Sequence, residues 1–245
     1  MKKQGQNKVA LITGADRGIG KAISERLAIL GIDTVLISNN VDSLKNAKSN
    51  FHAKYEKSPL TISLDVRIKN QIDTAIAEVI DQYGKIDYLI NVAGIAYYGG
   101  IELCTEEEWD ETLNVNVKGY FLMAKSVFPH MKAAGEGMII NMSSVWGIRG
   151  APTMLAYSTS KFAIEGFTKS LSEEARQYGI KVTSIILDKV DTPFRDEMGK
   201  YVNFSHEQKI RMLDVEDVAD AVTWVISSSP RSLPSSITLD AFLWK

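Results

Sequence analysis

A tyrosine and a lysine, Tyr157 and Lys161, lie four residues apart in the stretch Tyr157-Ser158-Thr159-Ser160-Lys161. On a helix this spacing places both side chains on one face. An ammonium group beside the phenol would lower the pKa of the phenol, which is about 10 when unperturbed. The pair therefore predicts a general acid/base that works near neutral pH. Taken alone, the pair fits an exposed helical turn with a solvated lysine better, so the prediction depends on other segments.

Three glycines follow the first apolar run, Val9 to Ile12, within Thr13-Gly14-Ala15-Asp16-Arg17-Gly18-Ile19-Gly20. The apolar residues after them recur at helical spacing as far as Gly31. A strand, a glycine turn and a helix in that order bring free main-chain N–H groups and a helix amino terminus to one point, which suits a pyrophosphate. A tight turn alone needs one glycine, so three at this position predict a dinucleotide site.

Two further predicted strands carry small or polar residues at their carboxyl ends. Residues 85–90 run into Asn91-Val92-Ala93-Gly94, and residues 138–142 lead to Ser143 and Ser144. In open parallel sheets, ligands bind at these ends. The hydroxyl of Ser144 can hydrogen-bond a substrate carbonyl there. Each segment by itself is also ordinary turn chemistry, so the site is predicted from the combination.

Strand patterns alternate with helical patterns at about residues 8–13, 33–37, 59–64, 85–91, 137–142, 181–187 and 236–240. This alternation predicts an α/β fold, a doubly wound Rossmann-type parallel sheet of about seven strands with helices on both faces. The 245 residues, 45% of them hydrophobic, fit a single domain over residues 1–245.

Composition argues against several kinds of partner. The formal net charge of −2 gives no reason to expect nucleic acid or an anionic membrane, and no stretch approaches the ~20 apolar residues of a membrane span. The one cysteine, Cys104, excludes an internal disulfide and, without a signal-peptide pattern, indicates the cytoplasm. The histidines are scattered, and Glu106-Glu107-Glu108 after Thr105 is typical of a capped helix start, so we predict no metal.

In their order and spacing these segments resemble the short-chain dehydrogenase/reductase family in its shorter form. Thr13 to Gly20 matches the family's TGxxxGxG, Asn91 to Gly94 its NAG motif with Val92 inserted, and Tyr157 to Lys161 its YxxxK. The resemblance covers essentially the whole chain. It implies the strand order 3-2-1-4-5-6-7 and an enzyme that interconverts a carbonyl and an alcohol.

The resemblance also implies catalytic roles. Asn116 matches the family's helix asparagine and Ser144 its catalytic serine. During reduction Tyr157 would donate a proton to the carbonyl oxygen while Ser144 holds that oxygen. Lys161 would bind the nicotinamide ribose and lower the pKa of Tyr157, and Asn116 would anchor a water that links Lys161 to solvent.

The cofactor residues implied by the resemblance are Thr13, Gly14, Asp16, Arg17, Gly18, Ile19, Gly20, Ser38, Asn39, Asp65, Val66, Asn91, Ala93, Gly94, Tyr157, Lys161, Val190 and Thr192. The second strand ends at Ser38-Asn39-Asn40, without the carboxylate that would bind the ribose of NAD, and Arg17 offers a guanidinium for a 2′-phosphate. We therefore expect NADP(H) to be favoured, with NAD(H) possible. Asp42 is an alternative ribose ligand. Asp65 would contact adenine, although such an aspartate is as often a helix cap.

One segment departs from the family pattern. Leu187-Asp188-Lys189-Val190-Asp191-Thr192 stands where the family usually has PGxVxT. The resemblance at Val190 and Thr192 implies that the carboxamide contact is kept. Asp188 would add a negative charge near the nicotinamide, unless it faces solvent or pairs with Lys189. A catalytically weakened cofactor-binding sensor or scaffold is therefore the alternative function.

By family position, the candidate substrate-pocket residues are Ile95, Ala96, Tyr97, Trp146, Met154, Leu155, Phe194 and Met198. Their aromatic and sulfur-containing side chains favour an apolar or aromatic ketone, although a single aromatic is more often plain packing. Residues 193–213 are predicted to form a mobile lid. The resemblance further implies a homotetramer, or a homodimer, built from the helices that contain Asn116 and Tyr157 and from the final segment, 236–244.

Overall fold

A seven-stranded parallel sheet in the order β3-β2-β1-β4-β5-β6-β7 forms the centre of the protein, seen in a computed structural model that describes residues 8–55, 58–194 and 204–244. The strands are β1 (Val9–Thr13), β2 (Asp33–Ser38), β3 (Leu60–Ser63), β4 (Tyr88–Asn91), β5 (Gly137–Ser144), β6 (Ile180–Leu187) and β7 (Ser236–Leu239). The predicted fold class and strand order are both confirmed.

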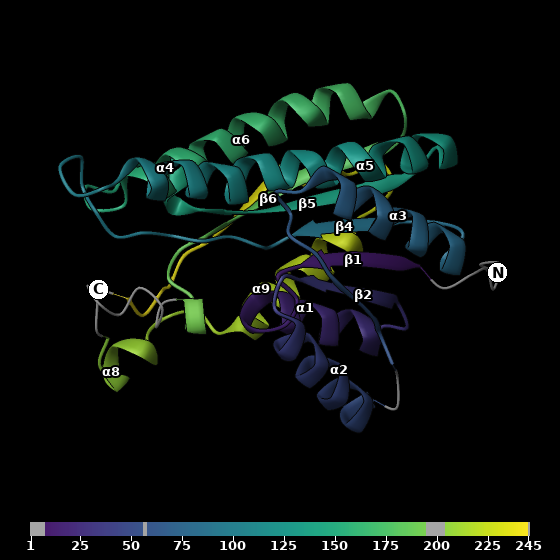
Figure 1. Cartoon of the computed structure of the whole chain (residues 1–245), viewed down its shortest axis with the longest axis horizontal. Coiled ribbons are helices and arrows are strands. Elements are labelled where there is room, and N and C mark those ends of the chain that lie inside the picture. Colours follow the sequence, from purple (N-terminus) through teal and green to yellow (C-terminus); the bar gives the residue numbers. More distant parts are fainter. Residues whose placement is uncertain (1–7, 56–57, 195–203, 245) are drawn as a thin grey trace.

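Helices cover both faces of the sheet (Figure 1). On one face lie α3 (Lys69–Tyr83), α5 (Gly119–Ala134) and α6 (Leu155–Arg176), and on the other lie α1 (Gly18–Ile29), α2 (Val41–Tyr55) and α9 (Val215–Ile226). The remaining described helices are α4 (Glu106–Leu113), the π-helix η1 (Asn114–Lys118), the 3-10 helix η2 (Val145–Gly147) and α8 (His206–Lys209). No helix in the described ranges has the length and apolar character needed to cross a membrane.

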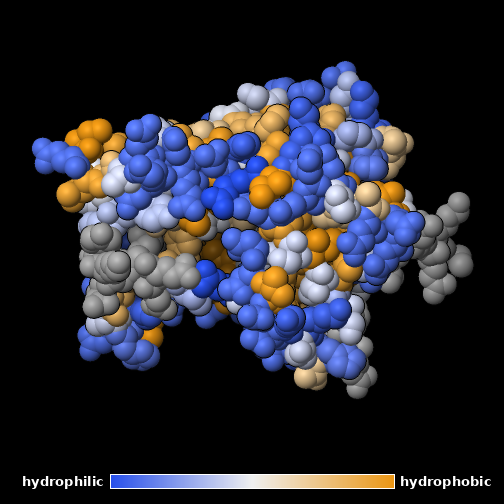
Figure 2. Space-filling view, viewed as in Figure 1, coloured by the Kyte–Doolittle hydropathy of each residue, from blue (hydrophilic) through white to orange (hydrophobic). Residues whose placement is uncertain are grey.

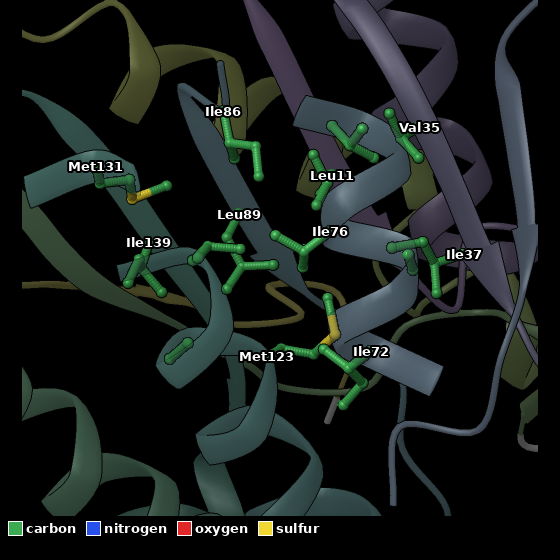
Figure 3. Packing of buried hydrophobic residues seen from close by; sticks show 14 of the residues in the cluster. Leu11, Val35, Ile37, Ile72, Ile76, Ile86, Leu89, Met123, Met131 and Ile139 are labelled. Carbon is green, nitrogen blue, oxygen red and sulfur yellow. The ribbon is translucent and has the colours of Figure 1, made fainter. Parts of the chain in front are cut away.

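The strands bury both of their faces, because each alternate side chain meets a different helical layer. Leu11 of β1 belongs to the cluster under α3 and α5, whereas its neighbour Ile12 belongs to the cluster under α1 and α9. Figure 3 shows the first cluster, in which Ile76 of α3 and Met123 of α5 pack toward Leu89 of β4. These two cores fix the sheet between its helices and so fix where the strand ends lie.

Two boundaries differ from the sequence prediction by more than one residue. Strand β4 begins at Tyr88 instead of residue 85, and the buried carboxylate of Asp87, just before it, accepts a hydrogen bond of 2.8 Å from the main-chain N of Val9. A side chain thereby takes a donor that a strand ladder would use. Strand β5 runs on to Ser144, where residue 142 was predicted, since Ser143 and Ser144 pair with Ile186 and Leu187 of β6. The extension carries Ser144 to the edge of the sheet where the other strands end.

Candidate active site

A cavity of about 370 Å³ lies at the carboxyl ends of β1 to β6, and Figure 2 shows a hollow with a hydrophobic floor on the face in view. Most of the predicted site residues line this cavity. They are Gly14, Asp16, Arg17, Gly18, Ile19, Gly20, Ser38, Asn39, Asp65, Val66, Ala93, Gly94, Ile95, Ser144, Trp146, Met154, Tyr157, Lys161, Val190, Thr192 and Phe194. Segments scattered from residue 14 to residue 194 of the chain thus meet in one place.

Two predicted cofactor residues lie behind the wall of the cavity. The hydroxyl of Thr13 accepts hydrogen bonds from the main-chain N atoms of Val92 (3.0 Å) and Ala93 (3.1 Å). The amide of Asn91 donates to Asn141 Oδ1 over 2.9 Å, in the sheet interior. Both side chains therefore hold the end of β4 against its neighbours, and neither is among the residues that line the cavity.

Three predicted substrate-pocket residues, Ala96, Tyr97 and Leu155, are also not among the lining residues. The hydroxyl of Tyr97 instead donates a hydrogen bond of 2.5 Å to Glu111 Oε2. Met198 falls outside the described residues. Of the predicted lid, the structure describes residues 193–194 and 204–213, which include the short helix α8.

The glycine turn between β1 and α1 is tightly packed. Gly14 has φ +64°, and a Cβ there would lie 3.1 Å from the main chain of Ala93. A Cβ on Gly20 would lie 2.2 Å from the carbonyl oxygen of Gly14. Helix α1 starts at Gly18, and no side chain in the described part of the protein caps it. The leading N–H groups of α1 are thus presented toward the cavity, an arrangement that fits an anionic phosphate group.

The end of β2 presents neutral groups to the cavity. Ser38, Asn39 and Asn40 line it there. Asp42, the alternative ribose ligand, lies in the first turn of α2 with its side chain 89% exposed, 3.6 Å from Lys45 Nζ. It is not among the lining residues, so within the described part of the chain this strand end has no carboxylate on the cavity.

Tyr157 and Lys161 lie on the first turns of α6, on the face toward the cavity, as their spacing predicts. Lys161 Nζ lies 5.5 Å from the centroid of the Tyr157 ring and donates to the carbonyl oxygen of Met142 over 2.8 Å. Burial lowers the pKa of Lys161 to about 8, while the nearby charge of Glu165 opposes that shift. A lysine so placed changes protonation close to neutral pH.

Ser144 caps the short helix η2, and its hydroxyl accepts a hydrogen bond of 3.2 Å from the main-chain N of Trp146. Two aromatic rings lie close to the ring of Tyr157. Its ring centroid lies 6.2 Å from that of Trp146 and 6.1 Å from that of Phe194. The phenol ring therefore packs against two aromatic side chains that line the cavity.

Asn116 is fully buried in the π-helix η1, which joins α4 to α5 without a break. Its amide donates to the carbonyl oxygen of Ile95 (2.9 Å) and to Ser160 Oγ (3.0 Å), and its Oδ1 accepts from the main-chain N of Ile95 (2.8 Å). The side chain thus ties the loop after β4 to α6. A π turn adds one residue to a helix, and such turns occur frequently at functional sites.

The segment that departs from the family pattern, residues 187–192, continues directly from β6. The main-chain N of Asp188 donates to the carbonyl oxygen of Leu239, and Asp188 lines the cavity. Of the expected alternatives, the structure has the one in which Asp188 pairs with Lys189, at 3.4 Å. Lys189 Nζ also lies 4.6 Å from the centroid of the Trp244 ring.

Sequence reasoning missed two charged residues of the cavity wall, Arg67 and Glu111. Arg67 follows Asp65 by two residues, a spacing at which an arginine can turn back onto the carboxylate. Glu111 comes from α4, and its approach to Arg67 depends on the packing of distant segments. Sequence reasoning also missed Glu165, which is 5% exposed and accepts a hydrogen bond from Ser184 Oγ over 3.2 Å.

Comparison with known proteins places the chain among relatives of similar length. Residues 8–202 match the short chain dehydrogenase family. The 3-oxoacyl-(acyl-carrier-protein) reductase of Thermotoga maritima is 32% identical over 228 residues, which cover 91% of each chain. A NAD⁺-bound xylitol dehydrogenase is similar in structure, with a TM-score of 0.87 at 25% identity over 97% of this chain and 99% of that one. A metagenomic short-chain oxidoreductase in complex with NADP has a TM-score of 0.81 at 28% identity, over 96% and 97%.

Proposed function

This chain belongs to the short-chain dehydrogenase/reductase family, and from that membership we propose that it is an NADP(H)-dependent oxidoreductase that interconverts a ketone, or another carbonyl, and a secondary alcohol. The observation that carries the proposal is a single cavity lined by Tyr157, Ser144 and Lys161 and also by the glycine turn before α1. The bound nicotinamide would supply or accept the hydride.

Each side chain has a proposed role. Tyr157 donates a proton to the carbonyl oxygen during reduction and accepts it during oxidation, while Ser144 orients that oxygen. Lys161, whose ammonium reaches Met142 O, binds the nicotinamide ribose and adds positive charge beside the phenol. Asn116 holds the loop after β4 through Ile95. It would also anchor a water that links Lys161 to solvent.

The cofactor preference rests on charge at the end of β2. Gly14, Gly18 and Gly20 would admit the pyrophosphate, Val190 and Thr192 the carboxamide, and Asp65 and Val66 would lie at the adenine. Similar structures hold NAD⁺ in one case and NADP in another, so the relatives leave the choice open. In this chain Arg17, Ser38 and Asn39 all line the cavity, and a cation with no carboxylate at the end of β2 favours a 2′-phosphate.

The proposed substrate is an apolar or aromatic ketone. Ile95, Trp146, Met154 and Phe194 line the cavity near Tyr157, and such side chains bind apolar groups. Because the Thermotoga maritima relative is a 3-oxoacyl-(acyl-carrier-protein) reductase, β-ketoacyl thioesters belong among the compounds tested.

The test is a spectrophotometric assay of NADPH oxidation against ketones, quinones and β-ketoacyl thioesters. We expect turnover that falls by about 10²-fold or more in Tyr157→Phe, the range for loss of a general acid. Tyr83→Phe, which alters a tyrosine of α3 outside the cavity lining, is the matched control. Tight NADPH binding without turnover on any compound would select the alternative, a sensor or scaffold, which the Leu187-Asp188-Lys189 turn favours.

We propose in addition that copies of the chain associate as a homotetramer or homodimer. Phe121 of α5 and Phe162 of α6 are 44% and 46% exposed, and Phe242 near the carboxyl end is 91% exposed. Large apolar side chains on these three elements would be covered by a second copy.

A further inference from the structure

We propose that Glu165 is a positioning residue for the reaction at Tyr157, and that its buried carboxylate acts from behind Lys161 to keep that side chain in the ammonium form. The inference rests on the proposed oxidoreductase function and adds a residue that its mechanism does not use. Glu165 is 5% exposed and is not among the residues that line the cavity, so it can act on the site only through its neighbours.

Helix α6 places Glu165 one turn beyond Lys161. Residues four apart on a helix share one face, so Tyr157, Lys161 and Glu165 follow one another along the buried side of α6. Lys161 Nζ donates to the carbonyl oxygen of Met142 on β5 over 2.8 Å. Glu165 Oε2 accepts from Ser184 Oγ on β6 over 3.2 Å. A cation and an anion thus lie one helical turn apart between the helix and the sheet.

The carboxylate of Glu165 is incompletely bonded. Apart from the bond from Ser184 to Oε2, its Oε1 has no hydrogen-bond partner in the part of the chain that the structure describes. Burying a carboxylate costs free energy unless an opposite charge or several donors compensate for the lost water. No hydrogen bond or ion pair joins Glu165 directly to Lys161, and both lie in the described ranges. The compensation is therefore a longer-range attraction between the two charges.

The charge of Glu165 opposes the effect of burial on Lys161. Burial lowers the pKa of Lys161 to about 8, and the carboxylate of Glu165 acts in the other direction. With a pKa of about 8, Lys161 is mostly protonated at neutral pH. Without the carboxylate that pKa would fall further, and the cation beside Tyr157 would be lost at neutral pH.

Two tyrosines also face the ammonium of Lys161. Its Nζ lies 5.5 Å from the ring centroid of Tyr157 and 5.5 Å from that of Tyr120 on α5. Burial raises the pKa of Tyr120 above its ordinary value, so its hydroxyl stays neutral. Tyr157 is also neutral while it holds the proton that it donates during reduction. Neither phenol therefore supplies the negative charge that keeps Lys161 protonated.

Other charged side chains are exposed, only partly buried or bonded elsewhere. In the described part of the chain, the buried charged residues are Asp87, Lys161 and Glu165, and Asp87 pairs with Lys8 just before β4 begins, away from the site. Strand β5 and helix η2 carry no charge, and the one charged residue of β6, Lys181, bonds to main-chain oxygens. The charged residues of α4, of η1 and of the rest of α6 are not buried: Glu106, Glu107, Glu108, Asp110, Glu111, Lys118, Lys169, Glu173, Glu174 and Arg176. Asp188, on the cavity wall, pairs with Lys189.

The first test measures the protonation of Lys161 without any substrate. Urea denaturation of the cofactor-free protein from pH 6 to pH 10 gives the free energy of unfolding of the wild type, Lys161→Met, Glu165→Gln and the double variant. The stability of the protein with Lys161, relative to the one with Met, rises with pH once the folded protein has lost a proton that the unfolded chain still binds. In the Glu165→Gln background this rise should begin lower, by about one pH unit or more.

Further variants separate the charge of Glu165 from its place in the packing. Glu165→Met, whose side chain is of similar length and introduces no unpaired amide, should shift the onset in the same direction as Glu165→Gln. Glu165→Asp keeps the charge and should lie closer to the wild type. Glu25→Gln is the matched control, because the side chain of Glu25 is also largely buried, at 12% exposed, but lies on α1 on the other face of the sheet (Figure 1). An unshifted onset in Glu165→Gln and Glu165→Met would overturn the inference.

Turnover is the second measurement. With NADPH and a carbonyl substrate, kcat/KM should fall on the alkaline side as Lys161 loses its proton, and in Glu165→Gln this fall should move to lower pH by about as much as the onset in the stability measurement does. A role confined to bonding Ser184 would lower turnover by the same factor at every pH, and Ser184→Ala shows the size of that effect. An unmoved pH profile in Glu165→Gln would overturn the inference and leave the proposed function standing. A wild type that binds NADPH but turns over none of the compounds would overturn both.

Discussion

Lys161 Nζ and the carbonyl oxygen of Met142 are joined by a hydrogen bond of 2.8 Å in the interior of the protein, where Lys161 is 4% exposed. The bond links the helix that carries Tyr157 to the middle of β5. A single main-chain acceptor does not replace the hydration of an ammonium group, which is why burial lowers the pKa of this lysine to about 8.

That pKa predicts how stability depends on pH. Between about pH 8 and the ordinary value of 10.5, the folded protein holds Lys161 neutral while the unfolded chain still binds the proton. The free energy of unfolding of the cofactor-free wild type should therefore rise with pH relative to Lys161→Met, by at most about 1.4 kcal/mol per pH unit. Urea denaturation of both proteins from pH 7 to pH 10 measures the difference. A difference that stays constant with pH would contradict the depressed pKa.

Cofactor preference gives the second prediction. The wild type should bind NADPH with a lower dissociation constant than NADH, because Arg17 provides a cation and Ser38 and Asn39 provide no carboxylate. Arg17→Ala should narrow the gap by about 1–3 kcal/mol, the range for hydrogen bonds to charged groups. Fluorescence titration with both cofactors checks this, and tighter binding of NADH by the wild type would refute the assignment.

The third prediction concerns the glycine turn. Gly14→Ala should lower the free energy of unfolding by about 1–2 kcal/mol, because alanine is strained in the left-handed backbone conformation of Gly14. It should also weaken NADPH binding, since the new Cβ would lie only 3.1 Å from the main chain of Ala93. Gly31→Ala is the matched control, because Gly31 has φ +80° with no atom within 4 Å of a built Cβ. It should lose similar stability and keep its NADPH affinity. Equal NADPH affinities in the two variants would contradict a tight turn at the cofactor.

The Asp188–Lys189 ion pair gives the fourth prediction. With Lys189 Nζ at 3.4 Å and side chains 11% and 19% exposed, the charge of Asp188 is largely balanced. We expect Asp188→Asn to lower the ratio of NADP⁺ to NADPH affinity, because it leaves the ammonium of Lys189 without its carboxylate. Lys189→Met should raise that ratio, because the uncovered carboxylate then stabilises the positively charged oxidised ring. Calorimetric titration with NADP⁺ and with NADPH measures the two affinities. A higher ratio in Asp188→Asn than in the wild type would contradict this electrostatic argument.

Assembly is the fifth prediction. Light scattering at micromolar concentration should report an oligomer. Phe162→Glu, which places a charge on the exposed face of α6, should shift it toward smaller species, whereas Glu78→Gln on α3 should not. A wild-type monomer would refute the association.

The local pattern of apolar and turn residues in the sequence predicted most of the fold. All seven strand patterns became strands, because each apolar run is bounded by turn residues and alternates with helical periodicity. One of the strand boundaries that sequence misplaced, at residues 85–87, lies beside a contact between Asp87 and Val9, which are far apart in the chain. Local periodicity carries no information about such a contact.

The residues of the candidate site show the same difference between what the sequence predicted and what it did not. Residues in motifs, such as Gly14 and Tyr157, were found because their spacing determines where they lie. Tyr97 was placed in the substrate pocket by family position, yet its hydroxyl bonds to Glu111, a residue of a different helix. The partners of long polar side chains depend on how whole elements pack, and the sequence alone does not give them.

The π turn at Asn114–Lys118 has a consequence for insertions and deletions in this chain. Each residue of a helix advances the direction of the side chains by about 100°. The π turn holds one more residue than an α turn, because its hydrogen bonds run from residue i to residue i+5, and it takes up that residue without rotating the helix that follows. Removing one residue from α5 itself would instead rotate the later part of that helix by about 100°, so that the buried Met131 would take the exposed position of His130. A single deletion within Asn114–Lys118 that spares Asn116 should therefore do less harm than a single deletion within the sixteen-residue helix that follows.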